Sequence, residues 1–239
     1  MRRDSRPAAV VSITRPARRK SRRTGRARTD RRSEIIARAT TLFADAGVAN
    51  VSMNDIADAV GIQKPSLYYF FPSKQELLGA VLRPLVDEPY AELRAIAEGS
   101  AEPAEKVVDG MVALGRAFGR YRSGMEILVR EKLERHLSPA ALREILREKA
   151  AYTELWRRIL REGVRSGRFA PLDDKITAFA AIGALNWMYA WFDPAGELSG
   201  EEVARRIAST FLGGLLAGPP RGAGRRSLRS LTVKKGSTP

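Results

Sequence analysis

The segment from residue 52 to residue 71, SMNDIADAVGIQKPSLYYFF, constrains the fold of this chain more than any other. Ser52 followed by Asp55 resembles a capping box, a pattern that starts a helix. Gly61 supplies the positive φ that a tight turn needs, and Leu67 provides an apolar anchor for a second short helix. This spacing predicts a helix-turn-helix, in which one face of the second helix is free to meet a partner.

Polar side chains gather on the free face of that second helix. Glutamine and lysine bond to base edges, and serine and tyrosine hydroxyls bond to bases or phosphates. A lysine at the start of the next helix adds its charge to the positive helix end, which favours an anion. Each side chain alone is equally consistent with a solvated surface, but together they favour duplex DNA. The candidate DNA-binding residues are Ser52, Asn54, Gln63, Lys64, Pro65, Ser66, Tyr68, Tyr69 and Lys74.

Helical periodicity continues on both sides of this motif, and no alternating pattern argues for strands. An apolar stripe begins near Asp30 and ends at Gly47. Ser73 and Ser199 carry the capping-box pattern, and Ser138 precedes a proline at a first helical position. The pattern predicts an all-α fold with about nine helices in total. Beyond residue 100 the apolar periodicity covers residues 104 to 121, 124 to 136, 139 to 166, 174 to 192 and 200 to 217.

Two prolines fall within the helix expected to run from Ser73 toward residue 97, at Pro84 and Pro89. Each proline removes one helical hydrogen bond. Two interpretations stay open. Either the helix bends near residue 84, or the prolines mark a helix end and a short connection.

The net charge of +15 lies in two tails. Residues 1 to 32 contain 13 Lys or Arg and 2 Asp, and residues 219 to 239 contain 6 Lys or Arg and no acidic residue. The stretch between them contains 23 basic and 25 acidic residues. Basic tails favour a polyanionic partner, and the alternative is that they are solubilising arms. The predicted domains are a basic disordered tail (1–28), a helix-turn-helix domain (29–78), a helical body (79–218) and a second basic disordered tail (219–239).

Composition argues against other classes of protein. The chain has no cysteine and one histidine, which excludes disulfides, thiolate metal sites and histidine cages. No nucleophile with a base and no phosphate loop is present, so neither an enzyme nor a cofactor is expected. The uncharged run from 176 to 192 contains Asn186 and predicts a buried helix rather than a membrane span. We therefore expect a cytoplasmic protein without a metal or a membrane partner.

Residues 35 to 82 resemble the N-terminal domain of the TetR family of bacterial repressors. The resemblance implies a homodimer on a palindromic operator, associated with the nucleoid when bound, with Tyr68 and Lys74 contacting phosphates and Lys64 and Ser66 nearest the bases. The matching features are Leu42, Phe43, Gly47, Ser52, Asp55, Ile56, Ala57, Gly61, Leu67, Tyr68, Phe71, Ser73, Lys74, Leu77 and Leu78. This chain departs from the commonest family pattern at Gln63, Pro65 and Phe70.

The family's body implies a helical effector-binding and dimerisation bundle. Aromatic and large apolar residues are candidates for an effector pocket, with plain core as the alternative. They are Met111, Leu114, Phe118, Tyr121, Leu128, Trp156 and Trp187. Small residues that let helices approach closely are candidates for a dimer interface, with packing inside a monomer as the alternative. The candidate interface consists of these small residues and two large ones close to them: Ala180, Gly183, Ala184, Trp187, Phe211 and Gly214.

The resulting functional hypothesis is a sequence-specific transcriptional regulator. We expect a repressor that a small apolar or amphipathic effector of unidentified structure releases from DNA. The alternative is a non-specific nucleic-acid-binding architectural protein that acts through its basic tails. Protection of a specific palindrome would separate the two, because a protein that binds by charge alone protects no particular sequence.

Overall fold

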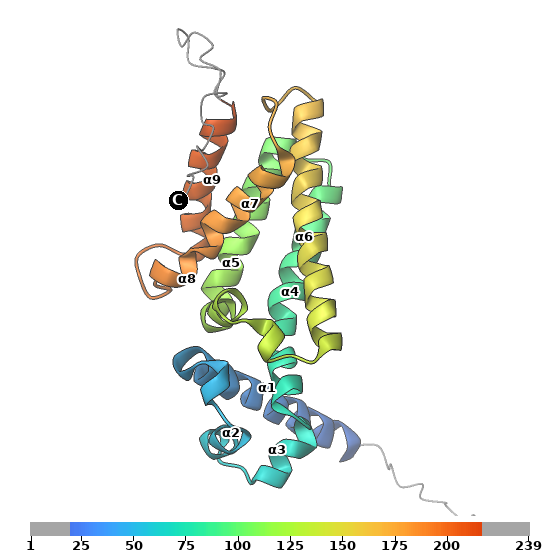
Figure 1. The fold of residues 1–239 in the computed structure, drawn as a ribbon, viewed down its shortest axis with the longest axis vertical. Coiled ribbons are helices and arrows are strands. Elements are labelled where there is room, and N and C mark those ends of the chain that lie inside the picture. The colour runs from blue at the N-terminus through green and yellow to red at the C-terminus, as the bar shows by residue number, and fades with distance from the viewer. Residues whose placement is uncertain (1–19, 217–239) are drawn as a thin grey trace, which may run out of the picture.

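The computed structural model describes residues 20 to 216, with side chains from residue 29 to residue 214. This part of the chain is helical and contains no strand. Figure 1 shows a small head of α1, α2 and α3 below an upright bundle, with α4 running from one to the other. The elements are α1 (Lys20–Ala46), η1 (Val48–Asn50), α2 (Met53–Val60), α3 (Lys64–Phe70), α4 (Lys74–Glu98), α5 (Pro103–Arg130), η2 (Leu133–Arg135), α6 (Pro139–Arg165), α7 (Asp174–Asn186), α8 (Met188–Trp191) and α9 (Gly200–Leu216).

Local capping chemistry places the short helices of the head. Ser52 Oγ accepts a hydrogen bond from the Asp55 backbone nitrogen, and the Asp55 carboxylate accepts one from the Ser52 nitrogen at 2.7 Å. These bonds hold the pKa of Asp55 below its ordinary value, the backbone bond from Ser52 being the largest cause. Gly61 ends α2 in the left-handed conformation, with φ 69°. The predicted capping box and turn are confirmed.

Several helix boundaries differ from the prediction. The first helix begins at Lys20 rather than near Asp30, because Lys and Arg favour helix without producing the apolar periodicity that was used to find it. The two helices expected over 104 to 121 and 124 to 136 form α5, with a break in helical geometry at Tyr121 (φ −127°, ψ 34°). This helix ends at Arg130, and residues 133 to 135 form η2 instead. The helix expected over 174 to 192 is divided into α7 and α8. The remainder of both predicted basic tails lies outside the described residues.

Helix α4 links the head to the body without interruption. Pro84 and Pro89 both lie inside it, so the interpretation that they end a helix was wrong. Packing keeps the helix in place despite the missing hydrogen bonds, since Leu85, Val86, Pro89 and Leu93 of this part of α4 are buried. The predicted domain boundary at residue 78 therefore falls within one continuous helix.

The body packs α5 against α9 through small residues. A Cβ atom added to Gly115 would lie 2.3 Å from the Gly200 carbonyl oxygen and 2.4 Å from the Ala204 Cβ atom. The two helix backbones therefore approach closely enough at this point to require glycine. On the other side of α5, buried Lys106 pairs with Glu162 of α6 at 3.1 Å. Among the described helices, none has the combination of length and apolar character needed to cross a bilayer.

Candidate DNA-binding helix and effector cavity

Helix α3 is held against the head by few contacts and presents most of its surface to solvent. Leu67 is its buried residue, and the Ile62 nitrogen donates to the Ala57 carbonyl oxygen at 3.0 Å across the turn. Ala57 is 2% exposed, so this small residue is buried at the end of α2 that faces the turn into α3. The rest of α3 is therefore available to a partner, apart from half-buried Phe70.

The structure brings eight of the nine candidate DNA-binding residues to the exposed surface around α3. Tyr69 is 66% exposed and Tyr68 is 40% exposed, both high values for aromatic side chains. Lys64 Nζ lies 6.0 Å from the centroid of the Tyr68 ring. Gln63 precedes α3 without capping it through its side chain, so its amide is not used there. The exposed candidates are Ser52, Asn54, Gln63, Lys64, Pro65, Ser66, Tyr68 and Tyr69.

Lys74 differs from the other candidates because its ammonium has partners inside the head. Lys74 Nζ donates to the Val48 carbonyl oxygen at 2.7 Å and to the Val51 carbonyl oxygen at 2.8 Å. Both acceptors lie in the segment between α1 and α2. Two of the three donors of the ammonium are thus used to tie α4 to that segment. This role leaves no signal in the local sequence, because the acceptors are backbone atoms more than twenty positions away.

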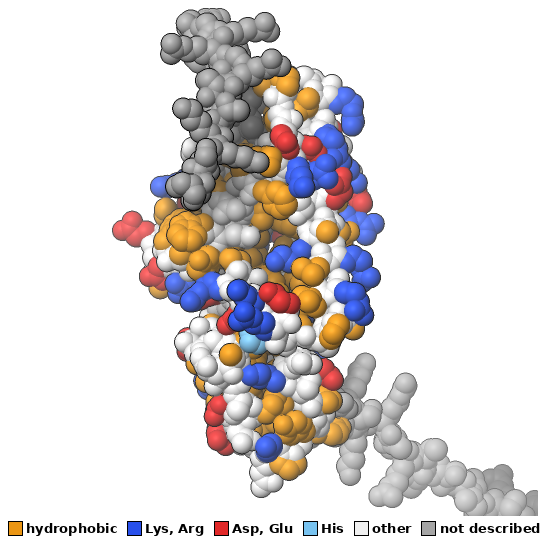
Figure 2. Space-filling view, in the orientation of Figure 1, with side chains coloured by type: hydrophobic (Ala, Val, Ile, Leu, Met, Phe, Trp, Pro, Cys, Tyr) orange, Lys and Arg blue, Asp and Glu red, His pale blue; other side chains and the backbone are white. Residues whose placement is uncertain are grey.

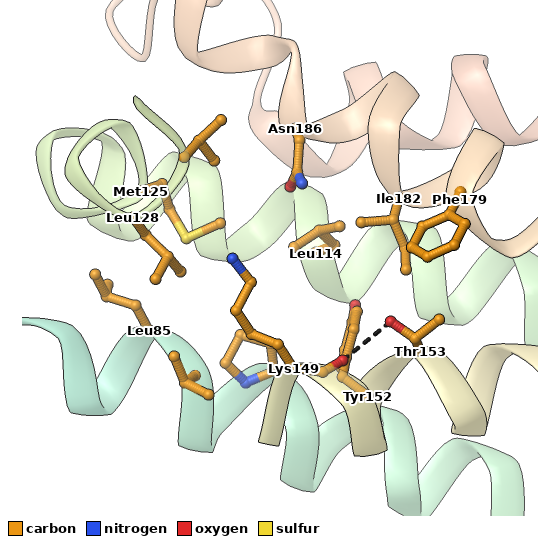
Figure 3. A pocket seen from close by; sticks show the side chains of 13 residues that line it. Leu85, Leu114, Met125, Leu128, Lys149, Tyr152, Thr153, Phe179, Ile182 and Asn186 are labelled. Carbon is orange, nitrogen blue, oxygen red and sulfur yellow. Dashed lines mark hydrogen bonds between the residues drawn. The ribbon is translucent and has the colours of Figure 1, made fainter. Parts of the chain in front are cut away.

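A cavity of about 220 Å³ lies in the body between α4, α5, α6 and α7 (Figure 3). Its wall is mainly apolar, and it opens to solvent. This volume is below the range of about 300 to 1,000 Å³ that is usual for ligand pockets, so it suits a small ligand or part of a larger one. The lining residues are Leu85, Val86, Pro89, Leu114, Met125, Leu128, Val129, Lys149, Tyr152, Thr153, Phe179, Ile182 and Asn186.

Two of the predicted pocket residues, Leu114 and Leu128, line this cavity. Met111, Phe118 and Trp156 do not, because they are fully buried and fill the core itself. Tyr121 is not among the lining residues, and its hydroxyl group donates a hydrogen bond to the Glu88 carboxylate at 2.9 Å. Trp187 is 59% exposed on the surface. Large aromatic side chains were a poor guide to the cavity, since they bury the most apolar area when they fill the core.

Polar groups enter the cavity from α6 and α7. Burial raises the pKa of Tyr152 to about 12, so this phenol stays protonated as a hydrogen-bond donor. Thr153 Oγ1 donates to the Lys149 carbonyl oxygen at 3.0 Å, which uses its donor within α6. Asn186 is directed toward the cavity from α7 (Figure 3). The cavity therefore combines an apolar wall with a few polar groups that could orient a ligand.

Known proteins share both parts of this architecture. A profile described as bacterial regulatory proteins of the tetR family matches residues 35–81, and one described as the tetracyclin repressor-like C-terminal domain matches residues 100–215. The HTH-type transcriptional repressor KstR2 of Mycolicibacterium smegmatis is 30% identical over 186 residues, covering 77% of this chain and 90% of that protein. The chain belongs to the TetR family. It is a transcriptional regulator of the helix-turn-helix class.

Solved TetR-family structures have the same arrangement of head and body. The ketosteroid transcriptional regulator KstR2 of Mycobacterium tuberculosis matches with a TM-score of 0.74 at 27% identity, over 79% of this chain and 96% of that chain. PfmR of Thermus thermophilus matches with a TM-score of 0.71 at 30% identity, over 78% of this chain and 98% of that chain. AibR, solved with isovaleryl coenzyme A and operator DNA, matches with a TM-score of 0.65 at 26% identity, over 78% of this chain and 98% of that chain.

The cavity of this TetR-family chain contains residues that sequence reasoning did not select. Leu85 and Pro89 contribute from α4, before the start of the matched C-terminal domain, and Lys149 contributes from the charged helix α6. Lys149 lies in a run of charged residues, REKAAYTELWRR, so no local pattern distinguishes it from a solvated lysine. A helical projection of α6 would have offered the one available signal, because Ile145, Lys149 and Tyr152 fall on one side.

Proposed function

We propose that this TetR-family chain is a repressor that binds a palindromic operator as a homodimer through α3 and is released when a small molecule occupies the body cavity. The observation that carries the DNA-binding part is the exposed face of α3, on which polar and aromatic side chains project around a single buried anchor, Leu67. A recognition helix held in this way reaches base edges while neighbouring groups contact phosphates.

Replacing Tyr68 with alanine should weaken binding to all duplex sequences, whereas replacing Lys64 or Ser66 should alter sequence preference. We expect Tyr68→Ala to lower the affinity for DNA roughly tenfold, because it removes one hydrogen bond to a charged phosphate group. The operator would first be selected from random duplex DNA with the wild-type protein. Titrations on the operator and on a scrambled duplex would then compare the variants with Ala59→Ser, an exposed position of α2.

Unchanged binding by Tyr68→Ala would contradict the assignment of α3 as the contact surface. A wild-type protein that selects no sequence would instead support the architectural alternative, which depends on the basic tails. Of those tails, the structure describes only the backbone of residues 20 to 28.

The homodimer is supported by an apolar stripe along α7 and α8 whose large side chains stay more than half exposed in the protomer. Ile176 is 63% exposed, Phe179 51%, Trp187 59% and Trp191 51%. Figure 2 shows apolar side chains gathered over this part of the body. Such a patch on a soluble protein marks an interface. The candidates Ala180, Gly183, Ala184 and Gly214 are also exposed, whereas Phe211 is half-buried.

One glycine of this stripe and two glycines of α9 are not needed for packing inside the protomer. A Cβ atom added to Gly183, Gly213 or Gly214 would meet nothing within 4 Å. This distinguishes them from Gly115, which has the close contact with α9 described above. Small residues with free space around them leave room for helices of a second copy to approach.

Replacing Gly183 with arginine should therefore produce a folded monomer. Arginine favours helix more than glycine does, so the protomer should retain its stability, while a charge at the centre of the stripe opposes association. Light scattering at micromolar concentration would measure the mass, and circular dichroism would measure helix content. Ala150→Arg, at an exposed position of α6, is the matched control and should remain dimeric. A monomeric wild-type protein would overturn the dimer.

The coupling between cavity and head is supported by the segment from residue 122 to residue 130, the part of α5 that follows the break at Tyr121. Met125 and Leu128 of this segment line the cavity. At its end, the Glu131 carboxylate accepts a hydrogen bond from the Val48 backbone nitrogen at 3.1 Å, and Glu131 Oε2 lies 3.4 Å from His136 Nε2. One short helical segment thus contacts both the cavity and the head.

Leu85 of α4 provides a second connection. It lines the cavity, and it also borders a cleft between α1, α4 and α5 at the junction of head and body. A Cβ atom added to Gly124 would lie 2.8 Å from Leu85 Cδ1, so this side chain has little free space on the α5 side. A ligand that displaces Leu85 must therefore move α4 or α5. A ligand that binds better to the displaced form shifts the equilibrium away from the DNA-binding one.

A further inference from the structure

Lys149 is the charged residue among the side chains that line the cavity. It extends from α6 into the space between α4, α5 and α7, toward the side where Met125 and Asn186 lie (Figure 3). The rest of the wall near it is aliphatic or aromatic, apart from the hydroxyl and amide groups described above. The cavity is open, and Lys149 is exposed through this opening.

The carboxylates nearest to Lys149 along α6 are engaged elsewhere. Glu144 pairs with Arg83 of α4 at 2.6 Å, and Glu148 pairs with the same guanidinium at 2.9 Å. Among the ion pairs of the described residues, none includes Lys149. Arg83 of α4 thus holds both neighbouring acids, and no carboxylate among the described residues pairs with the ammonium in the cavity.

An ammonium in such surroundings loses hydration without gaining a partner. The partial loss of solvent lowers the pKa of Lys149 from its ordinary value. A charge beside an apolar wall is stabilised when an opposite charge is brought to it, and hydrogen bonds between charged groups are the stronger ones. A ligand that carries an anion would supply the interaction that the protein omits.

We propose that the effector is an anionic amphiphile, whose carboxylate or phosphate group pairs with Lys149 while a short apolar chain fills the cavity. This inference rests on the proposed function, since it names the ligand class of the same cavity. A volume of about 220 Å³ accommodates roughly seven non-hydrogen atoms, at about 30 Å³ for each water-sized group. An acyl chain of about six carbons fits this space, and a larger head group would extend through the opening.

The two sources of the anion can be separated with three probes that share one chain. Hexanoate carries a carboxylate, hexanoyl coenzyme A carries phosphates beyond a thioester, and hexan-1-ol carries no charge. Calorimetric titration of each probe into the full-length protein measures affinity, and a titration of the operator complex measures release. If the carboxylate is the partner of Lys149, the affinity of Lys149→Met for hexanoate should fall roughly ten- to a hundredfold, and its affinity for hexan-1-ol should not change. A loss confined to hexanoyl coenzyme A assigns a phosphate.

Two controls make the result specific. Lys175→Met removes an exposed lysine that does not line the cavity and should bind every probe as the wild type does. Lys149→Met should bind the operator normally without a probe, because Lys149 makes no contact with the head. Raising the pH through the lowered pKa of Lys149 should weaken the binding of anionic probes, because the protonated amine is the form that binds them. The affinity for hexan-1-ol should not change over the same pH range.

Failure of this inference differs from failure of the proposed function. Equal binding of hexanoate and hexan-1-ol, with no effect of Lys149→Met, would overturn the anionic class and keep the cavity as the effector site. Wild-type protein that binds hexan-1-ol and neither anion would have the same meaning. Absence of binding by all three probes would overturn both the anion site and the release mechanism proposed for this cavity.

Discussion

Replacing Lys74 with methionine should destabilise the head by about 2 to 4 kcal/mol and thereby remove operator binding at physiological temperature. The Lys74 ammonium donates to the carbonyl oxygens of Val48 and Val51, and it holds the start of α4 against the segment between α1 and α2. Methionine keeps most of the apolar stem but leaves both acceptors without this donor. The positions of α2 and α3 relative to α4 depend on that segment.

The same substitution separates this internal role from the phosphate contact expected from sequence. Thermal unfolding without DNA should show a lower midpoint for Lys74→Met and an unchanged midpoint for Lys64→Met, whose lysine is exposed on α3. Both variants should bind the operator poorly, for different reasons. If Lys74→Met unfolds at the wild-type temperature and only the salt dependence of DNA binding decreases, then Lys74 acts as a phosphate contact.

The head was predictable because its determinants are local. Ser52 and Asp55 form the capping box within one turn, and Gly61 adopts the left-handed conformation that the turn requires. Both features depend on residues within a few positions of each other, so the sequence displays them directly. The family pattern then adds the exposed face of α3, which the structure places on the surface.

The cavity was not predictable in the same way, because four helices far apart in sequence contribute to it. Leu114 and Leu128 were selected for their size and lie on the wall, while Trp156 was selected for the same reason and lies in the core. Sequence periodicity indicates that a side chain faces inward, but not whether the inside is filled at that point. Lys149 was missed because its neighbours in sequence are charged and solvated.

Glycine positions show the same limit for helix packing. The prediction assigned the small residues of the C-terminal helices to a dimer interface and did not select Gly115. In the structure, the backbone approach between α5 and α9 depends on Gly115 and Gly200, whereas Gly183 and Gly214 have free space around them. A glycine that packs inside the protomer and one that leaves room for a partner have the same sequence signature. The two roles differ only in whether the neighbouring helix belongs to the same protomer or to a second copy.

Replacing Gly115 with alanine should destabilise the body by about 3 kcal/mol, because the new Cβ atom would meet backbone that no rotamer change can move. The atom would lie 2.3 Å from the Gly200 carbonyl oxygen, so α9 must shift away from α5. Gly119→Ala is the matched control, one turn further along α5, where the added atom would lie 3.8 Å from the Gly200 nitrogen. There the helix preference of alanine should stabilise the protein by about 0.5 to 1 kcal/mol.

The two substitutions should therefore change the free energy of unfolding in opposite directions, as measured by urea denaturation. Because α9 packs beside the apolar stripe of α7 in the body, the displacement caused by Gly115→Ala should also weaken dimer formation and, through it, affinity for a two-site operator. Equal stability of Gly115→Ala and Gly119→Ala would mean that α9 is free to move away from α5 at little cost. In that case the dimer, rather than the protomer, would have to hold α9 in place.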